Sequence, residues 1–506
     1  MADSTETTEK TNVENILFGR RDIYTVADEI TEENVLDEVN SALVYHLLNV
    51  QEEDYLYWYR RGFQPVLNRT KTYNDFVCNK VVVNVAAEVC EFKSGYLLQE
   101  PAAYVSRKSG KKSKVDKLNE YLYRSGKQTA DNQLADWFHM VGKAVLYVEP
   151  TADEDIPLKA YALDPRSAFV VYSLRPGNKP IFAVNIVLSG TTSFIDVYTD
   201  KRIYRLRGGA TQQKTSDYKN YVTQATVLDK VENNILGHIP IIEYRYNSVN
   251  MGAFEAVLPL LDAISDIQSN RADGIAQFIQ SIIVAVNCQF EEGTTASKIK
   301  EAGMIALSSI GENKADFKIL SEELNQDQTQ TLVDNLYDQV LHICSMPSTT
   351  KGHGSTSDNV GAVIFRDGWE QAASAARNTE DLFRESNRYF DAILVDVLKR
   401  KGILDIKPID FELNFVRNEV ANVQSKAQAA QTMMAMGLAP ELALKKSGLS
   451  SDPVADVKMS EKYLKLIWGD PDEAIKAEEK PDSNGQGEAV VIEEDNNNGE
   501  DADGNA

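Results

Sequence analysis

The sequence predicts an α+β protein, and three features of the chain predict this class. Short runs rich in β-branched and aromatic residues fill 141–245, where Gly, Pro, Asn and Asp separate them. Apolar residues at helical spacing occur on both sides of this part. Two long helical patterns also bracket a short mixed segment at 282–325. With 506 residues, the chain is long enough for several hydrophobic cores.

The N-terminal part is expected to be a flexible segment, 1–30, followed by a helix from Thr31 to Tyr59. The apolar residues of this helix recur every three or four positions, at Val35, Leu36, Val39, Leu43, Leu47 and Val50. A turn is expected at "RGFQPVLNRT". Asp75–Glu91 has a helix-compatible apolar face, so a second helix is expected there despite its many valines.

The strand-rich part is expected to form a meander of antiparallel strands, packed as a sheet with no site of its own. The runs that predict its strands are "KAVLYVEP", "SAFVVYSL", "PIFAVNIVL", "SFIDVYTD", "KRIYRLRGG" and "HIPIIEYRYN".

Two long helices are expected after the strand-rich part. The first covers 253–281, and its middle, "QSNRADG", is polar nearly all round, which indicates an exposed helix or one facing another polar surface. The second covers 326–346, has two adjoining apolar stripes and is expected to end at Pro347. Between them, 282–325 contains the strand-like runs "VAVNCQF", "MIALSSI" and "DFKIL".

A polar loop rich in Gly, Ser and Thr, 347–358, separates the second long helix from a third helical pattern. This third helix is expected from Asn359 to Arg400, with a bend at Gly368 and with Gly402 just past its end. The rest of the chain is predicted as a strand at "DIKPIDFELNF", three amphipathic helices within 419–470 and a disordered acidic tail, 471–506.

The net charge of −23 is unevenly placed along the chain. Residues 471–506 hold twelve Asp and Glu against two lysines, and residues 1–40 hold eleven acidic side chains against three basic ones. A sequence-independent nucleic-acid binder would show a basic surplus instead. One run, 106–127, is basic, with eight Lys and Arg residues and two tyrosines. It is interpreted as a solvated linker before the sheet, with a nucleic-acid patch as the less favoured alternative.

The cysteines and the N-terminus indicate the compartment. Four scattered cysteines, with no close pair, argue against a disulfide framework and against a zinc site, and favour a reducing environment. "MADSTETTEK" has neither a basic region nor an apolar core, so no signal peptide is expected. No apolar run is long enough to cross a bilayer, so no membrane partner is expected.

Motifs for catalysis and cofactor binding are missing, so no catalytic residue, cofactor-binding residue or metal ligand is predicted. At "YLYRSGKQT", Tyr121 and Gln128 occupy the places where a phosphate-binding loop needs a glycine and a hydroxyl. The five histidines form no HExxH pattern, and no GxSxG turn occurs. The loop "KGHGSTSDNVG" follows a helix rather than the strand that a dinucleotide-binding fingerprint requires.

The two long helices suggest an assembly. Together with the segment between them they would form a stalk with a small tip, and neither helix has an apolar stripe broad enough to be buried all round. Many copies placed side by side would bury the flanks of such a stalk, which suggests a closed ring with cyclic symmetry.

Four stretches of the chain carry a resemblance to a known family. They are "NKVVVNVAAEVCEFKSGYLLQEPAAYVS" (79–106), "LLDAISDIQSNRADGIAQFIQSIIVAVN" (260–287), "FKILSEELNQDQTQTLVDNLYDQVLHICSMPS" (317–348) and "NVGAVIFRDGWEQAASAARNTEDLFRESNRYF" (359–390). In this order they resemble the portal, or head-to-tail connector, family of tailed bacteriophages. The resemblance runs from about residue 30 to 470, and the order of the motifs gives it specificity.

The resemblance implies a portal-like subunit assembled as a cyclic ring of about twelve copies. Its implied parts are an α/β wing at 31–252, two stem helices at 253–281 and 326–346, a small mixed clip at 282–325, a tunnel loop at 347–358, a long wing helix with a strand at 359–418, and a helical crown at 419–470.

The resemblance also implies partners and a location. Double-stranded DNA would pass through the ring, packaged by the terminase large subunit and later ejected, and the ring would meet major capsid and scaffolding proteins and a head–tail adaptor. The protein would lie at the portal vertex of the virion, and in the host cytoplasm during assembly. The DNA-facing residues would be Ser348, Thr349, Thr350, Lys351, His353, Ser355 and Thr356, and the partner-facing clip residues Lys298, Lys300, Lys314 and Lys318.

The chemistry of the loop agrees with a sliding contact. Small hydroxyls, mobile glycines and one Lys351 per subunit would give weak contacts to phosphates that do not depend on base sequence, and an acidic chain would not hold the duplex tightly. Two other functions stay open: a nucleotide- or phosphate-dependent enzyme that uses the Gly-rich loop, and a capsid scaffold or adaptor without a channel.

Overall fold

The computed structural model consists of two compact units, Met1–Asn422 and Val423–Ala506. The residues that it describes are 19–71, 77–107, 109–153, 155–215, 218–279, 282–286, 288–289, 308–309, 316–320, 326–348, 368–415, 423–450 and 453–468. The mixed α+β class predicted from the sequence is confirmed.

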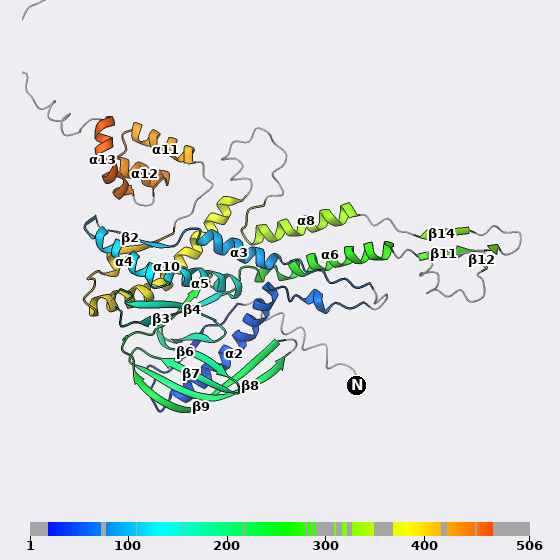
Figure 1. Cartoon of the computed structure of the whole chain (residues 1–506), viewed down its shortest axis with the longest axis horizontal. Helices are drawn as coiled ribbons and strands as arrows, with labels where there is room; N and C mark the ends of the chain where they lie inside the picture. Colours follow the sequence, from blue (N-terminus) through cyan, green and yellow to red (C-terminus); the bar gives the residue numbers. More distant parts are fainter. Residues whose placement is uncertain are drawn as a thin grey trace, which may run out of the picture. The chain divides into compact units, whose positions relative to one another are not determined.

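A six-stranded sheet, ordered β1-β5-β6-β7-β8-β9, forms the lower layer of the first unit in Figure 1. Its strands are β1 Ile23–Thr25, β5 Ala168–Ser173, β6 Pro180–Ser189, β7 Thr192–Tyr198, β8 Arg202–Thr215 and β9 Tyr218–Asn233. Strands β5 to β9 are a meander of antiparallel neighbours, and β1 joins the edge of β5 in parallel. Helix α2, Val35–Arg60, buries Val35, Val39 and Leu43 against one face of this sheet.

A second sheet has three strands, ordered β10-β3-β4, with bounds Ile241–Arg245, Lys143–Pro150 and Leu158–Leu163. Its core includes residues of α4 Lys112–Arg124, α5 Lys127–Val141 and α10 Trp369–Arg400. The short pair β15 Phe411–Asn414 and β2 Ala103–Ser106 borders the same core. The prediction of a single meander is therefore wrong, because β3 pairs with β10, almost a hundred residues later, instead of with β5.

The basic run 106–127 is not a linker, which corrects the sequence interpretation. Most of it forms α4, an amphipathic helix whose Val115, Leu118 and Leu122 are buried in the core of the three-stranded sheet. Helix α5 and the strands β1, β2, β4 and β9 were not expected from the sequence either. Helix α5 buries residues such as Leu134 and Phe138, so its hydrophobic face belongs to the same core.

Helix α6 covers Leu258–Ile279 and α8 covers Gln326–Ile343, where the sequence predicts two long helices. The strands between them form two antiparallel pairs, β11 Ile282–Val286 with β14 Asp316–Leu320 and β12 Cys288–Gln289 with β13 Ser308–Ser309. These strands coincide with the strand-like runs in the sequence.

The helix expected over Asp75–Glu91 begins later than predicted, because α3 covers Val85–Leu97. Helix α10 likewise begins at Trp369, directly after Gly368, whose φ of +83° places it in the left-handed region. Gly368 therefore directly precedes α10, and the part of the predicted helix before it, 359–367, lies outside the described residues. At the other end, Gly402 follows α10 with a φ of +68°, as expected.

The second unit contains α11 Val423–Ala435, α12 Pro440–Ser447 and α13 Pro453–Trp468, where the sequence predicts three helices. Pro440 occupies the first turn of α12, and Gly448 ends that helix with a φ of +65°. Ala430 and Ala443 are buried within this unit, whereas Met436, Met459 and Tyr463 are largely exposed.

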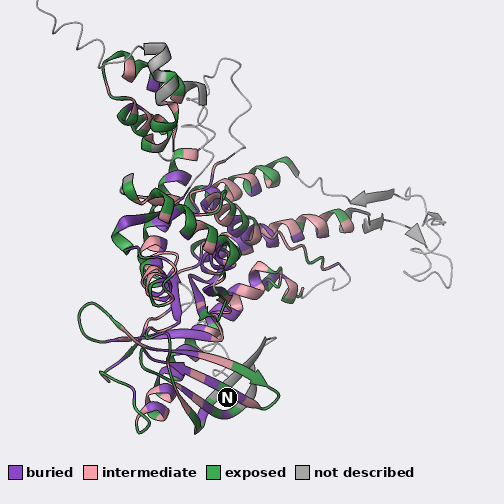
Figure 2. Cartoon of the chain, turned by 60° about the vertical axis from the view of Figure 1, so that its left-hand side comes forward, coloured by how far each residue is buried: buried purple, intermediate pink, exposed green. Residues whose placement is uncertain are grey.

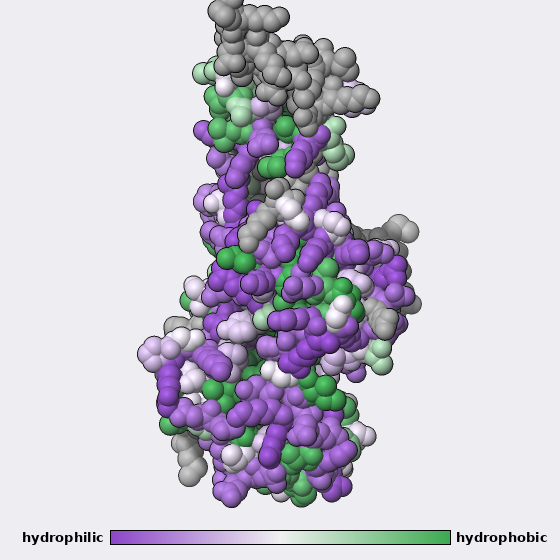
Figure 3. Space-filling view, turned by 90° about the vertical axis from the view of Figure 1, so that its left-hand side faces the viewer, coloured by the Kyte–Doolittle hydropathy of each residue, from purple (hydrophilic) through white to green (hydrophobic). Residues whose placement is uncertain are grey.

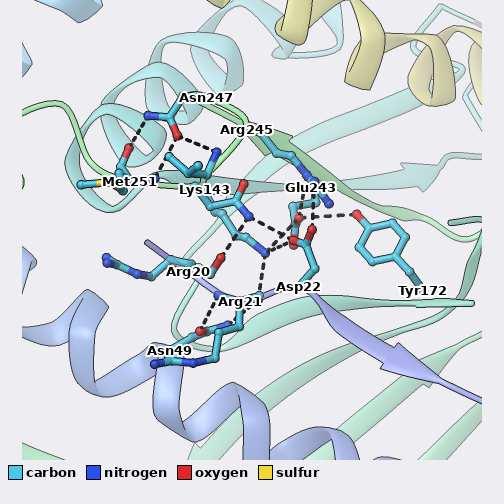
Figure 4. A network of polar contacts seen from close by, with 12 residues as sticks. Arg20, Arg21, Asp22, Asn49, Lys143, Tyr172, Glu243, Arg245, Asn247 and Met251 are labelled. Atoms are coloured by element: carbon cyan, nitrogen blue, oxygen red, sulfur yellow. Dashed lines mark hydrogen bonds and ion pairs between the residues drawn. The ribbon is translucent and has the colours of Figure 1, made fainter. Parts of the chain in front are cut away.

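A buried polar network joins the chain segment at Arg20–Asp22 to α2, to the three-stranded sheet and to the turn before α6 (Figure 4). The Lys143 ammonium lies 2.8 Å from Asp22 Oδ1 and 3.2 Å from Glu243 Oε1. The buried Arg20 guanidinium pairs with Glu52 on α2 and with Glu255, whose second carboxylate oxygen accepts the Gly252 amide at 2.8 Å. These contacts fix the start of α6 against the rest of the first unit.

Glu53 of α2, which follows Glu52, is 2% exposed, and its Oε2 has no hydrogen-bond partner among the described residues. Burial raises the pKa of Glu53 to about 7, although Arg20 and Lys143 act in the opposite direction. The carboxyl group therefore binds its proton more tightly in the folded chain than in the unfolded chain.

The raised pKa of Glu53 predicts that the effect of Glu53→Gln on the free energy of unfolding depends on pH. Between pH 4.5, the ordinary pKa, and about pH 7, the folded state keeps a proton that the unfolded state loses, so the wild-type free energy of unfolding falls as pH rises. The variant lacks this fall, and its stability relative to wild type should grow by at most about 3 kcal/mol between pH 4.5 and pH 8. Urea denaturation at several pH values measures it. Exposed Glu91→Gln is the matched control, and equal pH profiles for the two variants would contradict the assignment.

Candidate functional site: the α6–α8 pair and its loop

Helices α6 and α8 lie side by side in Figure 1, with α6 leading out to β11 and α8 returning from β14. They share a hydrophobic contact in which Leu261 and Ile264 of α6 belong to the same buried cluster as Val333, Val340 and Leu341 of α8. Residues of α2 and α3 complete this cluster, so the pair is attached to the first unit at one end. Farther out, Figure 2 shows mainly intermediate and exposed residues along the two helices.

The polar middle of α6 faces an extended stretch of chain, 79–83, through three parallel rungs. Asp273 Oδ1 accepts the Asn79 amide at 2.6 Å, Ser269 Oγ accepts the Val81 amide at 2.9 Å, and Ser265 Oγ accepts the Val83 amide at 3.3 Å. We call these three contacts the amide ladder. The sequence left two possibilities for the polar middle of α6, an exposed helix or a helix that faces another polar surface. The amide ladder shows the second.

The amide ladder exists because two repeats match in length. Every fourth residue of a helix advances about 6 Å along its axis. Every second residue of an extended chain advances about 6.6 Å and points its amide to the same side. Three α6 side chains spaced by four residues therefore meet three amides spaced by two. This pairing explains why 79–83 is extended and not helical, since its amides find acceptors without a neighbouring strand.

The Asp273 carboxylate, at one end of the amide ladder, is surrounded by several hydrogen-bond donors. Its Oδ2 lies 2.5 Å from Lys71 Nζ and 3.2 Å from an Arg69 nitrogen, and its Oδ1 also accepts from Asn79 Nδ2 at 2.9 Å. Burial raises the pKa of Asp273, but the Lys71 ion pair and the Asn79 donors lower it more, so the carboxyl stays ionised. The charge of Asp273 thus binds α6 to Arg69, Lys71 and Asn79.

The other side of the pair is open among the described residues. Ile275 of α6 is 52% exposed, and Leu332 and Ile343 of α8 are 49% and 53% exposed. Of the two apolar stripes that the sequence predicts on α8, the one containing Val333, Leu341 and Cys344 is buried. The stripe containing Leu332 and Ile343 is exposed at both of its ends.

The end of α8 is set by Ser345 and not by Pro347, which corrects the sequence prediction. Ser345 has a φ of +53°. Its amide donates to the His342 carbonyl at 3.1 Å, and the Met346 amide donates to the Leu341 carbonyl at 2.8 Å. This pair of bonds is a Schellman motif, which stops the helix before the proline.

The two flanks of the predicted tunnel loop lie close together. A Cβ placed on Gly368 would be 3.8 Å from the Met346 carbonyl oxygen and from the Pro347 Cα. The Trp369 ring, at the start of α10, lies among Phe92 and Tyr96 of α3. The last residues described before 349 and the first described after 367 are therefore neighbours in space.

Ser348 is the one predicted loop residue that the structure describes. It is half-buried, and its hydroxyl donates to Asp338 Oδ1 of α8 at 2.9 Å. Thr349, Thr350, Lys351, His353, Ser355 and Thr356 lie outside the described residues, as do Lys298, Lys300 and Lys314. Lys318 lies in β14, opposite Val284 of β11. The structure therefore does not test these residues as a group.

Sequence reasoning missed the amide ladder, although a signal for it exists. Ser265, Ser269 and Asp273 follow one another at intervals of four and so share one face of α6. Small acceptors at this spacing can receive amide donors from an adjacent chain. What the sequence does not reveal is which segment supplies the amides, because the partners are almost two hundred residues away.

Metal clusters and membrane-spanning helices are both absent from the part of the chain that the structure describes. No group of three or more His, Cys, Asp or Glu side chains there could hold a metal ion. No helix in that part has the length and apolar character needed to cross a membrane.

A comparison with protein families matches residues 46–465 to the family described as phage portal protein, SPP1 Gp6-like. The chain belongs to this phage portal protein family. The match covers nearly the whole stretch over which the sequence resembles portal proteins. Portal proteins are structural and not enzymatic, which agrees with the expectation of no catalytic residue.

No curated protein sequence matches the chain. Among solved structures, the portal-family chain is similar to a chain of the "Virion of native gene transfer agent (GTA) particle", at 10% sequence identity and a TM-score of 0.38. That similarity covers 72% of this chain and 89% of the other.

The amide ladder predicts that Asp273→Ala destabilises the first unit. The substitution removes the Oδ1 acceptor of two Asn79 N–H groups and leaves Lys71 and Arg69 without their carboxylate. Because both cations keep partial access to water, the expected loss in the free energy of unfolding is about 2–3 kcal/mol, below that of a fully buried pair. Chemical denaturation measures this loss.

The matched control is Asp266→Ala, which removes an exposed carboxylate from the same helix and should change stability by less than about 0.5 kcal/mol. Equal effects of the two substitutions would show that the ladder does not hold α6.

Proposed function

We propose that this chain forms a cyclic ring of about twelve copies at one capsid vertex, and that double-stranded DNA passes through the axial channel of the ring. Family membership supports a portal role for the chain. In this proposal α6 and α8 form the stem around the channel, the strands β11 to β14 belong to the clip, and the second unit is the crown. The ring conducts DNA during packaging by the terminase and during ejection.

The single observation that supports ring formation is that one side of the α6–α8 pair is exposed. The amide ladder occupies one side of α6, and the hydrophobic cluster occupies the contact between the helices. Leu332 and Ile343 remain exposed on α8, about 16 Å apart along the helix axis. A neighbouring copy would cover these side chains, and cyclic repetition of one such contact closes a ring.

The loop at 347–358 is proposed as the part that touches DNA. Its two flanks lie together, since Gly368 at the start of α10 is close to Met346 and Pro347 after the end of α8. Thr349, Thr350, Lys351, Ser355 and Thr356 would offer hydroxyl groups and one cation per subunit. Few cations mean few released counterions, so contacts of this type are weak and allow sliding.

The clip and the wing are proposed to bind proteins. Lys298, Lys300, Lys314 and Lys318 would face the terminase large subunit during packaging and a head–tail adaptor afterwards. Major capsid and scaffolding proteins would surround the wing. The assembled ring would reside in the virion, after assembly in the host cytoplasm.

The ring proposal predicts that Leu332→Asp combined with Ile343→Asp prevents assembly without unfolding the subunit. A charge placed in each contact would be buried without a partner, at a cost of several kcal/mol per interface. Light scattering with negative-stain imaging should show rings for the wild type and small species for the variant, with unchanged circular dichroism.

Val26→Asp combined with Ile235→Asp is the control, because both residues are also exposed apolar residues but lie outside α6 and α8. Intact rings in the Leu332/Ile343 variant would remove the observation on which the proposal depends.

The loop proposal predicts that replacing 349–356 with an equally long Gly-Ser segment leaves rings intact but reduces DNA packaging severalfold or more. Ser348 stays unchanged, because its bond to Asp338 belongs to the folded subunit. The measurement is the amount of nuclease-protected DNA per particle. If the protein were a scaffold without a channel, particles with the replaced loop would contain the normal amount of protected DNA. That outcome would refute the channel.

A further inference from the structure

The three-stranded sheet is the middle layer of the first unit, and in Figure 1 it lies between α10 and the six-stranded sheet. Ile242 and Tyr244 of β10 belong to one hydrophobic cluster with α10, and Ile241 belongs to another with Val170 of β5. The strand order β10-β3-β4 makes β10 an edge of this layer. Both faces of β10 are therefore covered, whereas one of its edges has no neighbouring strand in the part of the chain that the structure describes.

Two hydrogen bonds show which residues of β10 face the free edge. The Pro240 carbonyl accepts the Val148 amide at 2.9 Å, and the Tyr246 amide donates to the Gly142 carbonyl at 3.1 Å, so the even-numbered residues face β3. In an antiparallel pair, the backbone groups of alternate residues point to opposite edges. The N–H and C=O groups of the odd-numbered residues of 239–243 therefore point away from β3, and none of them has a hydrogen-bond partner among the described residues.

A cleft of about 760 Å³ lies along this edge. Tyr389, Ala392 and Ile393 of α10 line one side of it, and Val170 and Tyr172 of β5 line the other. Tyr389 is 50% exposed, and Figure 3 shows hydrophobic side chains at the surface of the chain in patches between hydrophilic ones. A strand added about 4.8 Å from β10 would lie between these two walls. Its side chains would meet apolar surfaces on both faces, which favours an apolar run.

The chain before Gly19 enters the described structure next to the end of β10. The Arg20 amide donates to the Asn250 carbonyl at 3.0 Å, and Asp22 Oδ2 lies 3.0 Å from a nitrogen of Arg245, the last residue of β10. A segment that precedes Gly19 can therefore reach the free edge of β10 from its C-terminal end.

The residues directly before Gly19 have the composition and length that the edge requires. Residues 13–18 read "VENILF", whereas 3–12 contain no apolar side chain. Six extended residues cover about 20 Å, and the five residues of β10 cover about 17 Å. Because Phe18 is next to Gly19, the segment would start at the C-terminal end of β10 and run back along it, which makes the two strands parallel.

The polar residues of this segment also fall in a suitable place. The Asn234 side chain donates to the Thr199 carbonyl at 2.6 Å and to the His238 carbonyl at 2.8 Å, so the end of the cleft near His238 is polar. Glu14 and Asn15 would lie toward this end, with the apolar residues 16–18 between the apolar walls.

We infer that residues 13–18 of the same chain occupy the cleft as a fourth strand, parallel to β10 and hydrogen-bonded to its free edge. The charged side chains around the cleft pair with one another, as Lys201 does with Glu29, so backbone hydrogen bonds and apolar contacts select the occupant. This inference goes beyond the proposed function and does not depend on it.

The test is residue-resolved amide hydrogen exchange on the full-length chain, with electron-transfer fragmentation. In the wild type, the Ile241 and Glu243 amides should exchange slowly, because they donate to the added strand. Ile16→Asp combined with Phe18→Asp should speed their exchange about 10-fold or more, since the edge opens when the segment leaves. The even-numbered amides of β10, which face β3, should stay slow in both proteins.

The matched control is Thr8→Asp combined with Thr11→Asp, which adds the same charges to the polar part of the N-terminal segment and should leave all these rates unchanged. A second variant tests the other side of the contact. Ala392→Trp places a large side chain in the α10 wall of the cleft, and it should speed exchange at Ile241 and Glu243 without altering residues 13–18.

Three results would overturn the inference. Fast exchange at both edge amides in the purified wild type would show that the edge is free for a strand of another protein. Slow exchange that persists in the Ile16/Phe18 variant would show that 13–18 is not the occupant. Slow exchange in wild-type rings that is lost in the variant designed not to assemble would assign the strand to a neighbouring copy.

Discussion

The amide ladder between α6 and residues 79–83 is the constraint on which the arrangement of the first unit depends. An extended segment without a neighbouring strand would leave its amides unsatisfied, and buried unsatisfied amides are rare in folded proteins. Ser265, Ser269 and Asp273 supply the missing acceptors. The segment leads directly into α3, so the ladder also fixes where that helix begins.

The ladder determines which sides of α6 are available to other molecules. One side of the helix is occupied by hydrogen bonds to its own chain, and another packs against α8. The Arg20 and Lys143 network holds the start of α6 with charges, in a region where Arg20 and Glu255 are fully buried. Removal of one member of such a pair leaves the other charge buried alone. Both ends of the attachment therefore restrict how α6 can tilt relative to the first unit.

Elements with strong periodicity could be predicted from the sequence. Helices α2, α6 and α8 and the three helices of the second unit have apolar residues at helical spacing, and β3, β5 and β6 are bounded by turn residues. The conformation of 77–84 could not be predicted, because a run of valines is compatible with a helix or with extended chain. The division into two sheets could not be predicted either, because the pairing of β3 with β10 depends on contacts distant in sequence.

The candidate site was less predictable than the fold. The exposed position of Leu332 and the buried position of Val333 follow from which side of α8 meets α6, and periodicity alone makes the two stripes equivalent. The end of α8 at Ser345 could not be predicted, because a serine with left-handed backbone angles has no distinctive sequence signal. The nearby proline, in contrast, is a strong signal for a helix end.

The adjacent flanks at Met346 and Gly368 have a consequence for how the family can diversify. When a chain segment starts and ends at one place, a change in its length displaces the helices on either side very little. Doubling its length costs only about 0.6 kcal/mol in loop-closure entropy. Insertions, deletions and new side chains can accumulate between these flanks while α8 and α10 keep their positions. Related chains can therefore change what this segment touches faster than they change the scaffold that holds it.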